Sequence, residues 1–94
     1  MEKIKKLFDE ENIPYVMEDR CGKVKPSALT TTKKIYNVSI NIETWGNAML
    51  VFGLNPFDEI FSSTDEDKVV EFLKKFINKL RELEKKSRAN YENI

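Results

Sequence analysis

The sequence predicts an α+β fold in which an antiparallel sheet packs on a long C-terminal helix and a short N-terminal helix. Three patterns support this prediction: a long apolar-periodic stretch near the C-terminus, a central segment that alternates apolar and polar residues, and a short amphipathic segment at the start. We therefore expect the order α-β-β-β-α, with a short fourth edge strand as an alternative, in a single domain of residues 1–94.

The first helix is predicted over residues 2–11, because Ile4, Leu7 and Phe8 recur at helical spacing. Asn12 follows as a residue that tolerates the left-handed conformation at a helix C-terminus. We expect the apolar side of this helix to lie on the sheet.

A first strand is predicted over residues 13–18, where apolar and polar side chains alternate. Pro14 near its start favours an edge strand or the beginning of a strand. Residues 20–32 predict a long connection, of which residues 23–25 would extend the first strand or form a short hairpin arm.

The clearest strand is predicted from Ile35 to Thr44, with one buried face and one solvated face. The residues expected on its buried face are Tyr36, Val38, Ile40 and Ile42. After a hairpin connection at residues 45–47, residues 48–52 are apolar on both faces, which favours a central strand or one whose outer face meets another surface. Residues 58–62 fit either a fourth short strand or an extended lead into the next helix.

The long helix is predicted over residues 63–88. Ser63 and Glu66 match a capping box at its start. The apolar residues on one helix face are Val69, Leu73, Phe76, Leu80 and Leu83. The helix is longer than the predicted sheet is wide, so the first helix or a second subunit must cover the last two of these residues. Residues 89–94 are expected to fray.

The sequence offers no catalytic constellation. Histidine is absent, which removes the commonest general base and metal ligand, and the single Cys21 lacks the partner that would make it a nucleophile. The acids at residues 58–67 lack the spacing of a calcium loop, and three of them belong to the first turn of the predicted helix. We therefore expect no catalytic residue, no metal, no cofactor and no enzymatic activity.

The location of the protein is predicted from absent signals. No apolar run is long enough to span a membrane, and the N-terminus lacks the apolar core of a secretory leader. A single cysteine cannot form an internal disulfide, which fits a reducing compartment. These observations predict a cytoplasmic protein.

Two known families share this order of elements, and both can be tested on residues. The order resembles that of the double-stranded RNA-binding domain, which places lysines at the start of its second helix, where residues 65–67 of this chain are acidic. Restriction-type nucleases carry a Glu-x-Lys motif on the third core strand, whereas Glu43 is followed by Thr44 and Trp45. The chain thus lacks the functional residues of both families.

The net charge is zero, but the charges occur in blocks. Residues 20–34 contain five basic residues and no acid: Arg20, Lys23, Lys25, Lys33 and Lys34. With the threonines at 30–32, they form a candidate contact for nucleic-acid phosphates or for an acidic partner, and a solvated loop is the alternative. Residues 35–67 carry six acids and no base, which predicts an acidic surface.

A second candidate site combines aromatic residues with nearby acids. Its members are Trp45, Phe57, Phe61, Glu43, Asp58 and Glu59. Aromatic side chains ringed by polar groups are typical of the residues that dominate the binding energy of protein interfaces. The alternative is that these rings cap the ends of a small core.

The sequence favours a small non-enzymatic binding protein that docks on a larger protein. Small, charge-patterned chains of this kind are typical of phage or mobile-element inhibitors of host or defence factors, including anti-defence proteins. The first alternative is an accessory protein that binds nucleic acid through residues 20–34. The second is a homo-oligomeric structural protein joined through Leu80 and Leu83 or through a sheet edge.

Overall fold

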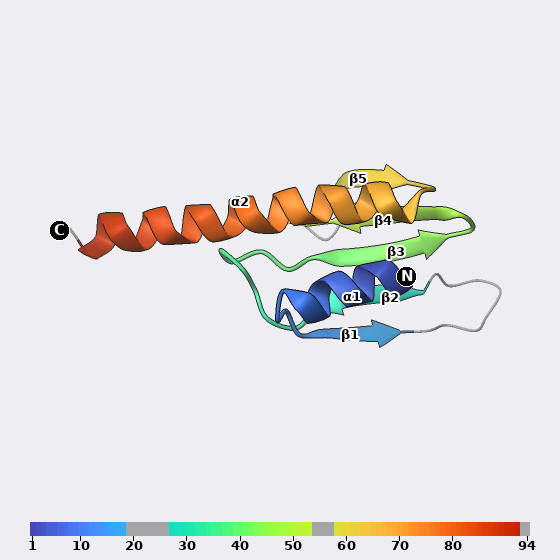
Figure 1. Cartoon of the computed structure of the whole chain (residues 1–94), viewed down its shortest axis with the longest axis horizontal. Helices are drawn as coiled ribbons and strands as arrows, with labels where there is room; N and C mark the ends of the chain where they lie inside the picture. Colours follow the sequence, from blue (N-terminus) through green and yellow to red (C-terminus); the bar gives the residue numbers. More distant parts are fainter. Residues whose placement is uncertain (19–26, 54–57, 93–94) are drawn as a thin grey trace.

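The structure is a computed structural model that describes residues 1–18, 27–53 and 58–92, in which two helices pack on one face of a five-stranded antiparallel sheet (Figure 1). The elements in chain order are α1 (Glu2–Glu10), β1 (Tyr15–Glu18), β2 (Ala28–Thr31), β3 (Asn41–Trp45), β4 (Ala48–Phe52), β5 (Glu59–Ser63) and α2 (Glu66–Glu92). The strands lie in the order β1-β2-β3-β4-β5, so each pairs with the next along the chain. The predicted α+β class is confirmed, and the possible fourth edge strand forms as β5, but the sheet has five strands rather than the three or four that we predicted.

The strand β2 lies inside residues 20–32, where we predicted a connection, and that prediction is wrong for residues 28–31. Here Leu29 and Thr31 are buried while Ala28 and Thr30 are half-buried, and the strand pairs with β1 on one side and β3 on the other. Threonine favours strands, but a single large apolar residue makes the alternation too weak to recognise. Residues 19–26 lie outside the described part of the chain.

The strand predicted from Ile35 to Thr44 is correct only in its second half, because a tight turn occupies the first. Ile35 and Val38 exchange two backbone hydrogen bonds of 3.0 and 2.9 Å. Between them, Tyr36 and Asn37 have φ angles of 49° and 62°, the left-handed conformation that two-residue turns of this kind require. Tyr36 therefore leaves the alternation and is 43% exposed. The predicted inward residues that are buried are Val38, Ile40 and Ile42.

The core lies between the helices and the covered face of the sheet. Its buried residues are Ile4, Leu7, Phe8, Ile13, Leu29, Ile40, Ile42, Val51, Val69, Leu73 and Ile77. On α2, Leu80 is also buried, whereas Phe76 and Leu83 of the predicted apolar face are only half-buried. Ile77, which we did not predict, is fully buried because α2 packs against both α1 and the β4–β5 side of the sheet.

The start of α2 differs from the predicted capping box of Ser63 and Glu66. Asp65 is the N-cap, since its Oδ1 accepts a hydrogen bond from the Asp67 N–H at 3.0 Å. The Ser63 hydroxyl oxygen accepts from the Asp65 N–H at 3.0 Å, so it orders the residue before the helix. The capping box was wrong because Asp65 takes the capping role and Glu66 points elsewhere.

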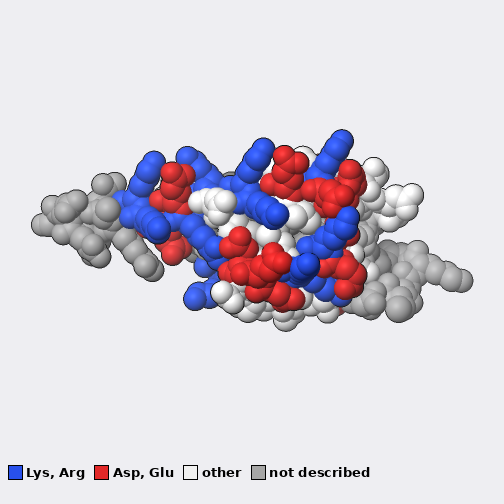
Figure 2. Space-filling model, viewed as in Figure 1, with Lys and Arg blue, Asp and Glu red and all other residues white. Residues whose placement is uncertain are grey.

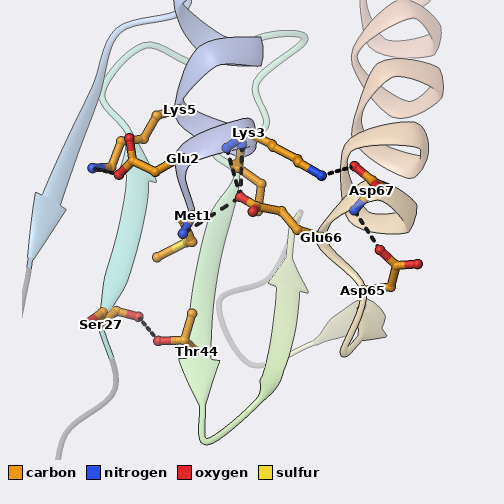
Figure 3. Close-up of polar contacts among 10 residues, drawn as sticks. Met1, Glu2, Lys3, Lys5, Ser27, Thr44, Asp65, Glu66 and Asp67 are labelled. Carbon is orange, nitrogen blue, oxygen red and sulfur yellow. Dashed lines mark hydrogen bonds and ion pairs between the residues drawn. The ribbon is translucent and has the colours of Figure 1, made fainter.

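The Glu66 side chain reaches from α2 to the first turn of α1 (Figure 3). Its Oε2 accepts hydrogen bonds from the backbone N–H groups of Lys3 at 3.0 Å and Ile4 at 3.2 Å. These donors have no acceptor within a helix, and Met1 at the N-cap of α1 provides no side-chain cap. One helix therefore caps the other, and the two elements begin side by side.

The end of α1 confirms the prediction for Asn12, which has a φ of 57°. The Ile13 N–H donates to the Phe8 carbonyl at 2.9 Å, and the Asn12 N–H donates to the Asp9 carbonyl at 3.2 Å. This pair of bonds defines a Schellman motif, and its apolar contact joins Ile13 to Phe8 in the core.

The helix α2 extends beyond the sheet at its C-terminal end (Figure 1). Its 27 residues span about 40 Å at 1.5 Å per residue. The helix continues to Glu92, so residues 89–92, for which we expected fraying, are helical, and residues 93–94 lie outside the described part. Neither described helix is both long enough and apolar enough to cross a membrane.

Candidate functional site

The sheet face opposite the helices is not covered by either described helix (Figure 1). Leu29, Ile42 and Val51 are paired across β2, β3 and β4 and are buried on the helix side. Because side chains alternate along a strand and paired residues share a face, the intervening residues lie on the other side. This open face consists of Val16, Glu18, Ala28, Thr30, Asn41, Glu43, Trp45, Ala48, Leu50, Phe52, Glu59 and Ser62.

A chain of side-chain hydrogen bonds runs along β3 on the open face. The Thr30 hydroxyl donates to the Asn41 Oδ1 at 2.9 Å, and the Asn41 amide nitrogen donates to the Glu43 Oε1 at 3.2 Å. The Trp45 indole N–H donates to the other oxygen of Glu43 at 3.1 Å. Glu43 therefore lies between an amide and an indole, and its carboxylate holds the Trp45 ring in place.

Apolar side chains flank this polar row. Trp45 and Val16 are 53% and 58% exposed, and Leu50 and Phe52 on the neighbouring strand β4 are half-buried without a helix above them. An exposed aromatic ring that is held by one polar hydrogen bond is suited to pack against another surface. The open face thus presents an apolar area with an ordered tryptophan at one end of the sheet.

The charged residues that the described strands place on the open face are all acidic: Glu18, Glu43 and Glu59. No Lys or Arg belongs to this set among the described strand residues. The helix-covered side differs, since Figure 2 shows Lys and Arg side chains along the coloured part of α2 with acidic side chains between them. The two faces of the molecule therefore differ in electrostatic character.

The structure places the predicted partner-binding residues on different surfaces. It brings Trp45 and Glu43 together on the open face, and Glu59 lies on the same face opposite Phe52. Asp58 is exposed just before β5. Phe61 instead lies on the covered side, where its ring stacks on the ring of Phe72 with centroids 4.5 Å apart. Phe57 lies outside the described residues.

The predicted basic site is described only in part. Arg20, Lys23 and Lys25 lie outside the described residues. Lys33 and Lys34 are exposed, and they line a pocket of about 160 Å³ between the end of α1, the residues after β2 and α2. Across the three ranges that the structure describes, no group of three Asp, Glu or Cys side chains is placed to hold a metal ion.

Of the open face, sequence reasoning assigned only Glu43, Trp45 and Glu59 to the partner site, and it missed the rest, including Val16, Asn41, Leu50 and Phe52. For Leu50 and Phe52 the signal was the apolar character of residues 48–52 on both sides, which predicts that the outer side of this strand meets another surface. Strand pairing was needed to show which side is outer, because Val51 rather than Leu50 turns to the core.

Searches against protein families, curated proteins and solved structures found no match to this chain.

Proposed function

We propose that this chain is a non-enzymatic binding protein of the cytoplasm that docks on a larger protein through the open face of its sheet. The observation that carries the proposal is the exposed Trp45 ring, ordered by Glu43 on a sheet face that no described helix covers. An amphipathic ring held in one orientation loses little conformational entropy on binding. Tryptophan is also enriched among the residues that contribute most to interface affinity.

The charge of the open face indicates the chemistry of the partner. Glu18, Glu43 and Glu59 surround an apolar area, and the described strands add no base to it. A complementary surface presents Lys or Arg side chains around an apolar patch, because charge complementarity speeds association and excludes like-charged partners. Proteins that hold nucleic acid have such surfaces. Blocking one of them would make this chain an inhibitor of the kind encoded by phages and mobile elements.

The same charges argue against nucleic acid as the ligand of the open face. Phosphate groups supply most of the affinity of nucleic-acid complexes, and carboxylates on the binding surface repel them. A second copy of this chain would also bring acid against acid if two open faces met. A basic protein surface is therefore the occupant that the open face favours.

The proposal is tested by identifying a captured partner and measuring its affinity for purified variants. Trp45→Ala is expected to weaken binding by about 2 kcal/mol or more, as for an interface hot spot. Tyr36→Ala is the matched control, because Tyr36 is an aromatic residue of similar exposure, 43%, in the turn before β3 rather than on the open face. The Tyr36→Ala variant should bind the partner with the affinity of the parent chain.

The contribution of the negative charge is tested with Glu43→Gln, which removes the charge and keeps the size of the side chain. Binding of the parent should weaken as salt is added, and that salt dependence should be smaller in Glu43→Gln. Equal affinities of Trp45→Ala and the parent chain would contradict the proposal. An oligomer seen by light scattering that Trp45→Ala converts to a monomer would instead assign the open face to a second copy.

A further inference from the structure

A pocket of about 160 Å³ lies between the end of α1, the residues after β2 and α2. Its apolar walls are Ile13, Pro14 and Ile35, and Lys33 and Lys34 lie at its edge. Asn12 and two residues of α2 one turn apart, Arg81 and Glu84, complete the lining. The site is therefore built from three segments that are distant in the sequence and share no residue with the open face.

The walls of this pocket are held in place by α2. Arg81 donates two hydrogen bonds to Glu11 at the end of α1, one to the side chain and one to the backbone carbonyl. Glu84 accepts a hydrogen bond from the Tyr36 N–H in the tight turn at 2.9 Å. Because both neighbouring segments are fixed to the same helix, the pocket is preformed and a ligand need not order it.

The charged groups that line the pocket are three positive side chains, Lys33, Lys34 and Arg81, and one negative side chain, Glu84. Arg81 forms an ion pair with Glu11, whereas Glu84 accepts a hydrogen bond from the neutral Tyr36 N–H and keeps its negative charge. Lys33 and Lys34 are exposed, and neither forms an ion pair with a carboxylate of the described residues. Guanidinium groups carry five N–H donors, so Arg81 also keeps donors beyond the two that Glu11 accepts. The two ammonium groups and these remaining donors outnumber the single Glu84 carboxylate, so the pocket favours an oxyanion.

The volume limits what can bind. Pockets for drug-sized ligands measure about 300–1,000 Å³, and this pocket is smaller at about 160 Å³. It accommodates one compact group rather than a whole cofactor. A phosphate group suits two lysines better than a carboxylate does, since it carries more charge and more acceptor oxygens.

We infer that this pocket binds a phosphate group, with Lys33 and Lys34 as its charge partners and Arg81 as a positioning residue. The group belongs either to a small phosphate or phosphomonoester or to the backbone of a nucleic acid. This inference concerns a site separate from the open face, so the two proposals stand or fall independently.

The test is a titration of the whole chain with inorganic phosphate, in which NMR monitors the backbone amides. Chloride keeps the ionic strength constant. We expect saturable shifts confined to the amides around residues 12–13 and 33–35. The double variant Lys33→Gln/Lys34→Gln should weaken the apparent affinity by about tenfold or more. The control Lys74→Gln/Lys75→Gln alters two adjacent exposed lysines of α2 outside the pocket and should bind as the parent does.

A second titration with a single-stranded oligonucleotide that lacks terminal phosphates distinguishes the two sources. If the oligonucleotide binds more tightly than inorganic phosphate, and this binding requires Lys33 and Lys34, the result would support the pocket and assign its phosphate to nucleic acid. Shifts that do not saturate, or that are the same in the double variant and the parent, would overturn the inference. Because both lysines are exposed, the double variant should fold as the parent does, which thermal unfolding verifies.

Discussion

The guanidinium of Arg81 binds two oxygens of Glu11 at once, the side-chain Oε2 at 2.5 Å and the backbone carbonyl at 2.7 Å. Glu11 is the C-cap of α1, and carbonyls at a helix end have no partner within the helix. The contact therefore caps α1 and joins it to α2. Together with the hydrogen bond from Tyr36 to Glu84, it shows that parts of the same chain lie against α2 near Leu80, which is 4% exposed.

Loss of this contact should destabilise the fold. We expect Arg81→Ala to lower the free energy of unfolding by about 1–2 kcal/mol, the scale of charge-assisted hydrogen bonds reduced for partial exposure. Arg81→Lys should lose more than half as much stability as Arg81→Ala, because an ammonium cannot reach both oxygens as a planar guanidinium does. Urea denaturation measures both variants, with Lys79→Ala on the exposed side of α2 as the control. An Arg81→Lys variant as stable as the parent would show that the second hydrogen bond contributes nothing.

Glu66 should contribute to stability as a cap supplied from a neighbouring helix. Glu66→Ala leaves the N–H groups of Lys3 and Ile4 without their acceptor, and we expect a loss of about 1–2 kcal/mol, as for other N-caps. Glu66→Gln should fall between Glu66→Ala and the parent, because it keeps an acceptor oxygen. Glu71→Ala is the control, since Glu71 only pairs with Lys75 on the surface. Equal losses for Glu66→Ala and Glu71→Ala would contradict the capping role.

Ile77 should contribute more to the free energy of unfolding than Leu83, which the sequence predicted for the apolar face of the helix. It is fully buried, whereas Leu83 is half-buried. Ile77→Ala is expected to cost about 2–5 kcal/mol through lost burial and the cavity that remains, and Leu83→Ala should cost clearly less. Chemical denaturation compares the two, with the exposed Asn78→Ala as a baseline. The assignment of Ile77 to the core fails if Leu83→Ala proves the more damaging change.

The turn before β3 offers a stabilising substitution. Asn37 has a φ of 62°, a conformation that glycine adopts without steric penalty. Asn37→Gly is therefore expected to raise the free energy of unfolding by up to about 1 kcal/mol. Ser39→Gly should have the opposite sign, because Ser39 has no positive φ and glycine there adds only chain entropy. A loss of stability in Asn37→Gly would mean that the asparagine side chain itself supports the turn.

Tyr15 should make the fold sensitive to alkaline pH. Burial raises the pKa of the Tyr15 phenol, and the negative charge and hydrogen bond of Asp9 act in the same direction. A raised pKa in the folded state stabilises the protein while the phenol is protonated, and this contribution is lost as pH rises through that pKa. The hydrogen bond to Asp67 likewise raises the pKa of Lys3, so part of the alkaline decline comes from that residue.

Tyr15→Phe isolates the phenol, because it removes the titration and leaves Lys3 unchanged. The stability of this variant should decline less steeply at alkaline pH than that of the parent, as measured by urea denaturation over a pH series. Ultraviolet absorbance of tyrosinate should also show one tyrosine that ionises late in the parent and is missing in the variant. Parallel pH profiles of the two proteins would rule out this role for Tyr15.

Features that depend on near neighbours in the chain were predictable. The Schellman motif at Asn12 and the position of α2 follow from spacing and residue type within a few turns. The strand β2 was missed because Leu29 is its only large apolar residue, and its pairing with β1 and β3 supplies what its composition lacks. The capping box failed because the Glu66 carboxylate accepts from the N–H groups of Lys3 and Ile4 in α1 instead of from a donor at the start of its own helix.

The candidate sites also contain features that near neighbours in the sequence predict and features that depend on distant segments. Trp45 and Glu43 are two residues apart on one strand, so their shared face could be anticipated. Phe61 was grouped with them by proximity in the sequence, yet strand pairing turns its ring toward Phe72 of α2. The pocket at Lys33 and Lys34 could not be anticipated, because two of its three walls come from elsewhere in the chain.

The sequence by itself determined the α+β class, the two helices and the presence of Trp45 beside an acid, because periodicity and residue type act over a few neighbouring positions. Only the tertiary structure decided that the sheet has five strands, that Leu50 and Phe52 face outward, and that α2 caps α1 and lines a pocket beside Lys33 and Lys34. Those outcomes depend on which distant segments pair and pack, and that choice is set by the whole chain's burial of apolar surface rather than by any one stretch.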